Sequence, residues 1–133
     1  MRTIILTACL LIGSLATLTA SQYPDYVIDS FGEVTGFRHT NEPPAIMRGL
    51  FVSEMHRLTI TATHADLEYG ATRVRTQFKR CTTWQQGETV FFHYYNGAET
   101  VLLARNIGAL ALQFTDANGV AYEPIAFVLV HGG

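Results

Sequence analysis

The stretch that decides the fold is residues 90–103, which read VFFHYYNGAETVLL. Near its middle lies Asn96-Gly97, the dipeptide that best tolerates the positive φ angles of a two-residue type I′ turn. We therefore predict a β-hairpin in which Tyr95 faces Ala98 and the residues further out pair in the same register.

The two faces of this hairpin carry different side chains. One face is apolar and ends in a pair of opposite charges, as expected of a core face with a solvated rim. The other face is rich in aromatic rings. The core face holds Val90, Phe92, Val101 and Leu103, with Glu88 opposite Arg105. The aromatic face holds Phe91, His93, Tyr95, Thr100 and Leu102.

Alternating patterns in the rest of the chain predict further strands, and no window keeps the apolar spacing of a helix. A second hairpin is expected at residues 116–119, where Gly119 suits a left-handed position, and Pro124 marks a bulge or an edge in the last strand. The spacing predicts an all-β domain, an antiparallel β-sandwich of roughly seven to eight strands, with a small β-barrel as the alternative. The other predicted strands are 26–31, 46–52, 57–63, 73–79, 110–114 and 125–129.

The N-terminus has the pattern of a secretory signal peptide. A positive charge at Arg2 precedes an uncharged apolar run over residues 4–16, and small residues suit cleavage after Ala20. The run is shorter than a membrane-spanning helix needs. We predict that residues 1–20 are a signal peptide. Residues 21–133 then form a single secreted domain with no membrane span, periplasmic if the source is a Gram-negative bacterium.

Charge and cysteine content narrow the partner classes. The chain carries 9 basic and 11 acidic residues, and this small net negative charge does not favour a nucleic-acid partner. Cys9 is lost with the signal peptide, which leaves Cys81 as the one cysteine of the mature chain. Cys81 is therefore either a buried thiol or the site of an intermolecular disulfide that joins two copies into a homo-oligomer.

No motif in the chain predicts an enzyme. The serines after residue 20 lack the Gly-x-Ser-x-Gly setting of a nucleophile, and no glycine-rich phosphate loop is present. His56 and His64, expected on one continuous strand, would lie about 26 Å apart, too far to share a metal ion. We predict a non-enzymatic protein without cofactor or metal, and thiol-dependent activity of Cys81 is the enzymatic alternative.

Two groups of residues are candidates for binding a partner. Aromatic residues suit a sugar ring or the apolar centre of a protein interface. Basic residues suit an acidic partner, although an edge strand also favours them as protection against aggregation. The aromatic group is Trp84, Phe91, His93 and Tyr95, and the basic group is Arg73, Arg75 and Lys79, with Arg80 beside it.

Together these features predict a secreted, non-enzymatic recognition module that binds an extracellular protein or glycan through the aromatic face of the hairpin. The alternative is a structural or assembly subunit whose copies associate through strand edges or through an intermolecular Cys81 disulfide. A small-molecule carrier is a third possibility, and it would need a hollow barrel.

Overall fold

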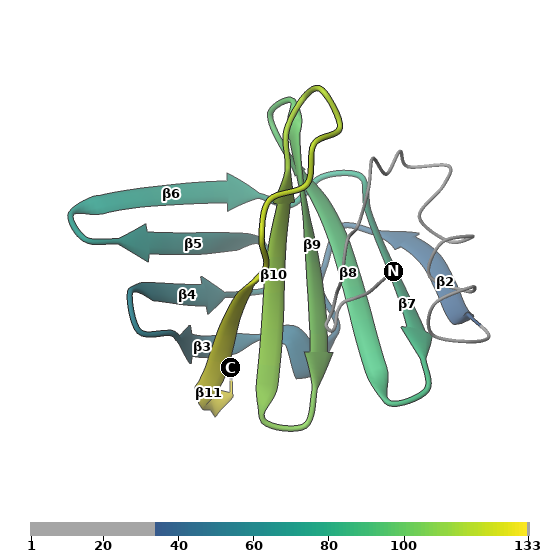
Figure 1. The fold of residues 1–133 in the computed structure, drawn as a ribbon. Coiled ribbons are helices and arrows are strands. Elements are labelled where there is room, and N and C mark those ends of the chain that lie inside the picture. The colour runs from purple at the N-terminus through teal and green to yellow at the C-terminus, as the bar shows by residue number, and fades with distance from the viewer. Residues whose placement is uncertain (1–33, 133) are drawn as a thin grey trace.

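The computed structural model describes residues 34–132, which are almost entirely β-structure (Figure 1). The predicted signal peptide and the predicted strand at residues 26–31 lie outside this range. The helical element in the described residues is a short 3-10 turn, η1 (Ala45–Met47). Within the same range, no helix has the length and apolar character needed to cross a membrane. The strands are β2 (Thr35–Thr40), β3 (Gly49–Val52), β4 (His56–Ile60), β5 (His64–Tyr69), β6 (Thr72–Gln77), β7 (Cys81–Gln86), β8 (Thr89–Asn96), β9 (Glu99–Asn106), β10 (Ala109–Thr115) and β11 (Ile125–Gly132).

These described strands form one antiparallel sheet of ten, in the order β2-β7-β8-β9-β10-β11-β3-β4-β5-β6. The sheet curls into a half-barrel. In Figure 1, β7 to β10 run side by side and β3 to β6 run across them. β11 joins the two halves, because it pairs with β10 on one side and with β3 on the other. A single sheet thus supplies both layers around the core.

The all-β prediction is confirmed, but the arrangement is a curled sheet rather than a sandwich of seven or eight strands. In a sandwich, two separate sheets pack face to face. Here Ala111 pairs with Ala126 and Val128 with Val52, so the ladder continues through β11. Alternation within a strand indicates which side chains point inward, but not which strand is its neighbour.

The core lies inside the curl, between the two halves. Phe78 directly follows β6, and its ring centroid lies 5.1 Å from that of Phe92 and 5.0 Å from that of Tyr94, both on β8. This edge-to-face contact joins parts of the sheet that are far apart in strand order. The other buried core residues are Met47, Phe51, Leu58, Ile60, Ala65, Cys81, Val101, Leu103, Leu110, Leu112 and Phe127.

The hairpin of β8 and β9 forms as predicted, but its register differs by two positions. Asn96 pairs with Glu99, so the loop is Gly97-Ala98 rather than Asn96-Gly97. Gly97 has a φ of 65° and Ala98 has no positive φ, the sign pattern of a type II′ turn with glycine at its first position. Because the shift is even, every side chain stays on its predicted face.

The same shift changes the partners further along the hairpin. Tyr95 pairs with Thr100 instead of with Ala98, and Val90 rather than Glu88 pairs with Arg105. The predicted charge pair at this end is therefore wrong. The Arg105 guanidinium donates to backbone carbonyls instead.

The predicted turn at residues 116–119 is confirmed. The Asp116 carboxylate accepts hydrogen bonds of 2.9 Å from two backbone amides of the turn, and Gly119 has a φ of 85°. Pro124 lies just before β11 rather than inside it. The proline therefore removes no hydrogen bond from the ladder.

The predicted strand at residues 57–63 ends early, and residues 61–63 reverse the chain. His56 and His64 consequently lie on two neighbouring strands, β4 and β5, and not on one as predicted. The side-chain oxygen of Thr61 accepts hydrogen bonds from two backbone amides that follow it. Such local bonds compete with an extended strand.

Candidate functional site

The outer side of β2, β7 and β8, away from the core, carries six rings that we call the aromatic face. Rings on neighbouring strands meet because paired residues share a side of the sheet. Trp84 pairs with Phe91, and their rings stack with centroids 5.3 Å apart and 11° between planes. Phe37 lies against Trp84, with centroids 5.8 Å apart. The aromatic face consists of Phe37, His39, Trp84, Phe91, His93 and Tyr95.

Three of the predicted binding residues form the buried floor of this face. Trp84, Phe91 and His93 are 2%, 0% and 3% exposed. Val34 and Ala121 pack against the cluster that contains Trp84 and Phe91. Burial lowers the pKa of His93 to about 4, so its imidazole is neutral at physiological pH. In this structure these three side chains shape the face but offer a partner little surface.

The rim of the aromatic face is open to solvent. Phe37 is 44% exposed, His39 is exposed and Tyr95 is half-buried. The Tyr95 ring meets that of His93 edge-to-face, with centroids 5.3 Å apart. A partner that docks here would therefore first meet Phe37, His39 and Tyr95.

Phe37 and His39 are the two members that sequence reasoning missed. The signal that could have found them is the two-residue spacing in residues 35–40, TGFRHT, which places both rings on one side of a strand. Gly36 weakens that signal, since glycine inside a strand pattern lowers the expectation of a strand. In the structure Gly36 has a φ of 67° and lies where the pairing of β2 with β7 shifts register.

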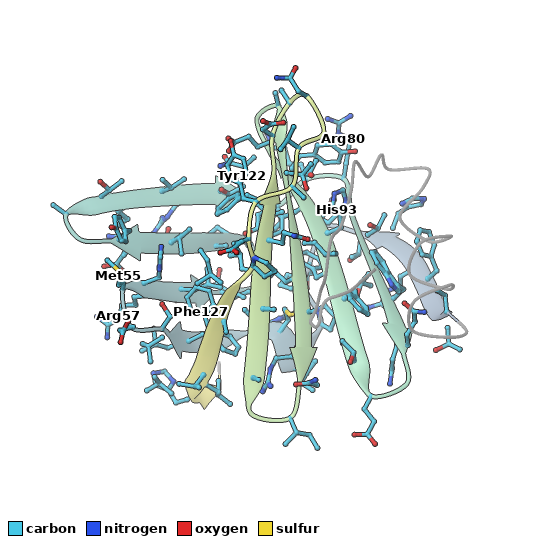
Figure 2. All side chains as sticks on the ribbon, viewed as in Figure 1. Met55, Arg57, Arg80, His93, Tyr122 and Phe127 are labelled. Carbon is cyan, nitrogen blue, oxygen red and sulfur yellow. The ribbon has the colours of Figure 1, made fainter. Side chains whose placement is uncertain are left out.

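A cation lies at the end of the aromatic face. Arg80 has a left-handed φ of 53°, and its backbone amide donates to the side-chain oxygen of Asn41 over 3.2 Å. Its guanidinium carbon lies 5.8 Å from the centre of the Tyr95 ring, within cation–π range. Figure 2 shows Arg80 and His93 on one side of the view and Arg57 on the other. Arg80 therefore belongs with the aromatic face.

The predicted basic group does not join the aromatic face. Arg73 and Arg75 lie on β6, at the opposite end of the strand order from β2. Both bind the Asp66 carboxylate on β5, Arg75 through hydrogen bonds of 2.8 and 2.9 Å and Arg73 through one of 2.9 Å. Lys79 lies beyond the end of β6, in the connection to β7.

Asp66 is the buried centre of this second surface, and it is 4% exposed. The hydrogen bonds from Arg75 hold the pKa of its carboxyl well below the ordinary value, with a further contribution from Arg73, although burial acts in the opposite direction. The carboxylate is therefore ionised at physiological pH. It holds both guanidinium groups in fixed positions.

Side chains capable of nucleophilic or metal chemistry are dispersed or buried. Within residues 34–132, no three His, Cys, Asp or Glu side chains gather closely enough to hold a metal ion. Cys81 is a free, fully buried cysteine, and burial raises the pKa of its thiol to about 11. The thiol is thus protonated at neutral pH, whereas a nucleophile must be a thiolate. A disulfide between copies would require the core to open around Cys81.

No protein-family model matches this chain, and no curated protein or solved structure matches it either. The two surfaces just described differ in chemistry, because one is aromatic with a polar rim and the other is a charged strand edge. Function is therefore inferred from their contacts, burial and charge.

Proposed function

We propose that the protein is a secreted, non-enzymatic recognition module that binds an extracellular protein or a glycan through the aromatic face. The observation that carries this proposal is the array of packed rings across β2, β7 and β8, which stays accessible at Phe37 and Tyr95. Aromatic side chains are enriched at protein interfaces, and their flat faces suit sugar rings.

The floor of the face supports this role because it is rigid. Trp84 and Phe91 are stacked and almost fully buried, so they support the rim residues in fixed positions without meeting a partner themselves. A preorganised surface loses little conformational entropy when it binds. At the rim Phe37 offers apolar area, while His39 and Arg80 are exposed and offer hydrogen-bond donors. An apolar centre inside a polar rim is the usual composition of a protein interface.

The rim residues are the positions at which the proposal can be tested. His93 is 3% exposed, so its replacement would disturb the packing of β8 as well as any contact with a partner. Phe37 and Tyr95 reach solvent, and their truncation leaves the stacked pair of Trp84 and Phe91 in place.

Replacing both Phe37 and Tyr95 with alanine should weaken partner binding by about tenfold or more, the effect of removing two aromatic contacts from an interface. Trp84 is the only tryptophan of the chain and lies against Phe37, so its fluorescence reports occupancy of the face. The glycan arm uses titration with soluble oligosaccharides of glucose and of N-acetylglucosamine. For a protein partner, the immobilised domain is incubated with the culture medium of the source cells, and the proteins that it retains are compared between variants.

The matched control is Ile107→Ala, because Ile107 is 86% exposed in the turn between β9 and β10. It should bind like the unaltered domain, and thermal melting should show that all variants are folded. A partner held equally by the control and by the Phe37/Tyr95 double variant would overturn the proposal. Failure of both arms to yield any ligand would overturn it as well.

A further inference from the structure

β6 is a regular, open edge of the sheet. It is the last strand in the sheet order and pairs with β5 through six consecutive residue pairs without a bulge. No strand of the described chain pairs with its other side (Figure 1). β2, at the other end of the order, has an irregular register. A regular open edge is the kind of strand to which an extended peptide can add.

The outward backbone groups of this edge belong to Arg73, Arg75 and Gln77. The amide of Phe78 donates to the carbonyl of Thr63 on the β5 side over 2.9 Å. Hydrogen bonding to one neighbour alternates along an antiparallel strand, so the even-numbered residues of β6 bond towards β5. Arg73 and Arg75 therefore turn their amide and carbonyl groups towards the open side.

The same two residues place positive charge beside that edge. Asp66 binds both guanidinium groups, yet the side chains of Arg73 and Arg75 remain 58% and 50% exposed. The carboxylates that face these arginines, Asp66 and its neighbour Glu68, lie on β5, so the charges nearest the open edge are the two guanidinium groups of β6. Val74, between the two arginines, points to the opposite face and is 41% exposed.

We propose that β6 binds an extended acidic segment of a partner protein by strand addition. The backbone of the added segment pairs with Arg73 and Arg75, its acidic side chains meet the two guanidinium groups, and an apolar side chain between them covers Val74. A second copy of β6 is a poor occupant, because arginine would then face arginine across the pair. This surface is separate from the aromatic face and does not depend on the function proposed above.

The test uses a synthetic peptide of alternating glutamate and valine, and amide hydrogen exchange of the protein measured by NMR. Binding should slow exchange of the Arg73 and Arg75 amides, which then become hydrogen-bonded. A peptide of alternating lysine and valine should leave both amides unchanged. Higher salt should weaken binding, because the guanidinium groups are exposed. Unchanged exchange of both amides at saturating glutamate peptide would overturn the proposal.

A pair of variants separates strand addition from general attraction of anions. Arg73→Gln keeps the Arg75 contact with Asp66 and should weaken peptide binding about twofold to fivefold, as for loss of one exposed charge pair. Arg57→Gln removes the same charge from β4, two strands from the edge. Arg57 pairs with Glu68, which in turn pairs with Arg73, so both arginines lie on one face. The Arg57 variant should bind the peptide with unchanged affinity. Equal losses in both variants, as expected for a sulfated glycan spread over the face, would contradict strand addition.

Discussion

Replacing Phe92 with alanine should lower the free energy of unfolding by about 3–5 kcal/mol. Phe92 is fully buried, and its ring centroid lies 5.1 Å from that of Phe78 and 5.9 Å from that of Tyr94. The loss has two parts, the apolar area that is no longer buried and the cavity that remains. This cavity would lie at the contact between the end of β6 and β8, so both halves of the curl would be affected.

Urea unfolding followed by circular dichroism measures this effect. Phe37→Ala is the matched control, because it makes the same chemical change at a ring that is 44% exposed. The control should lose about 1 kcal/mol, as for a partly exposed contact. Equal losses in the two variants would contradict the placement of the main core on the Phe92 side of β8.

Replacing Arg105 with alanine should cost about 2 kcal/mol, the effect of removing a charged donor from partly buried hydrogen bonds. Arg105 is 6% exposed and donates to the carbonyls of Ile46 at 3.1 Å and Ala109 at 3.2 Å, and also to that of Asn106. Its guanidinium carbon lies 5.5 Å from the centre of the Phe51 ring. The side chain thus ties the turn η1 to the turn between β9 and β10, two segments far apart in the sequence.

Thermal and urea unfolding test this role, with Arg57→Ala as the control. Arg57 is exposed on β4, and its replacement should change the free energy of unfolding by no more than about 0.5 kcal/mol. Arg105→Lys should recover part of the loss, since an ammonium group reaches fewer carbonyls than a guanidinium. An Arg105→Ala variant as stable as the Arg57→Ala variant would show that these carbonyl contacts contribute nothing to folding.

Local rules were enough to predict most strands and the faces of their side chains. Alternation assigns Phe91 and Phe92 to opposite sides of β8, and the structure places Phe92 in the main core and Phe91 on the aromatic face. The exact pairing depended on whether Asn96 entered the loop. Type I′ and II′ turns both accept Gly97, so composition could not choose between them.

Long-range pairing could not be predicted in this way. β11 lies between β10 and β3, and this insertion turns two expected layers into one curled sheet. Strand preference depends on neighbours and burial that exist only after folding. Nothing in the local pattern of residues 125–132 indicates which two strands flank them.

The sequence predicted some of the residues of the candidate site, but not which of them are buried and which are exposed. The sequence placed Phe91, His93 and Tyr95 together, and the structure confirms that His93 packs against Tyr95. Burial of Phe91 involves Val34 and Ala121, which lie far from β8 in the chain and carry no periodic signal. The role of these rings in binding remains a prediction that the rim variants test.

The central claim is that one continuous sheet curls so that β8 turns Phe92 and Tyr94 inward and Phe91 outward. Proton NMR distances between ring protons test this most directly. We predict close contacts from Phe78 to the rings of Phe92 and Tyr94, and from Trp84 to the ring of Phe91. Contacts from Phe78 to the Phe91 ring would instead mean that the faces of β8 are reversed, and both the core and the aromatic face described here would be wrong.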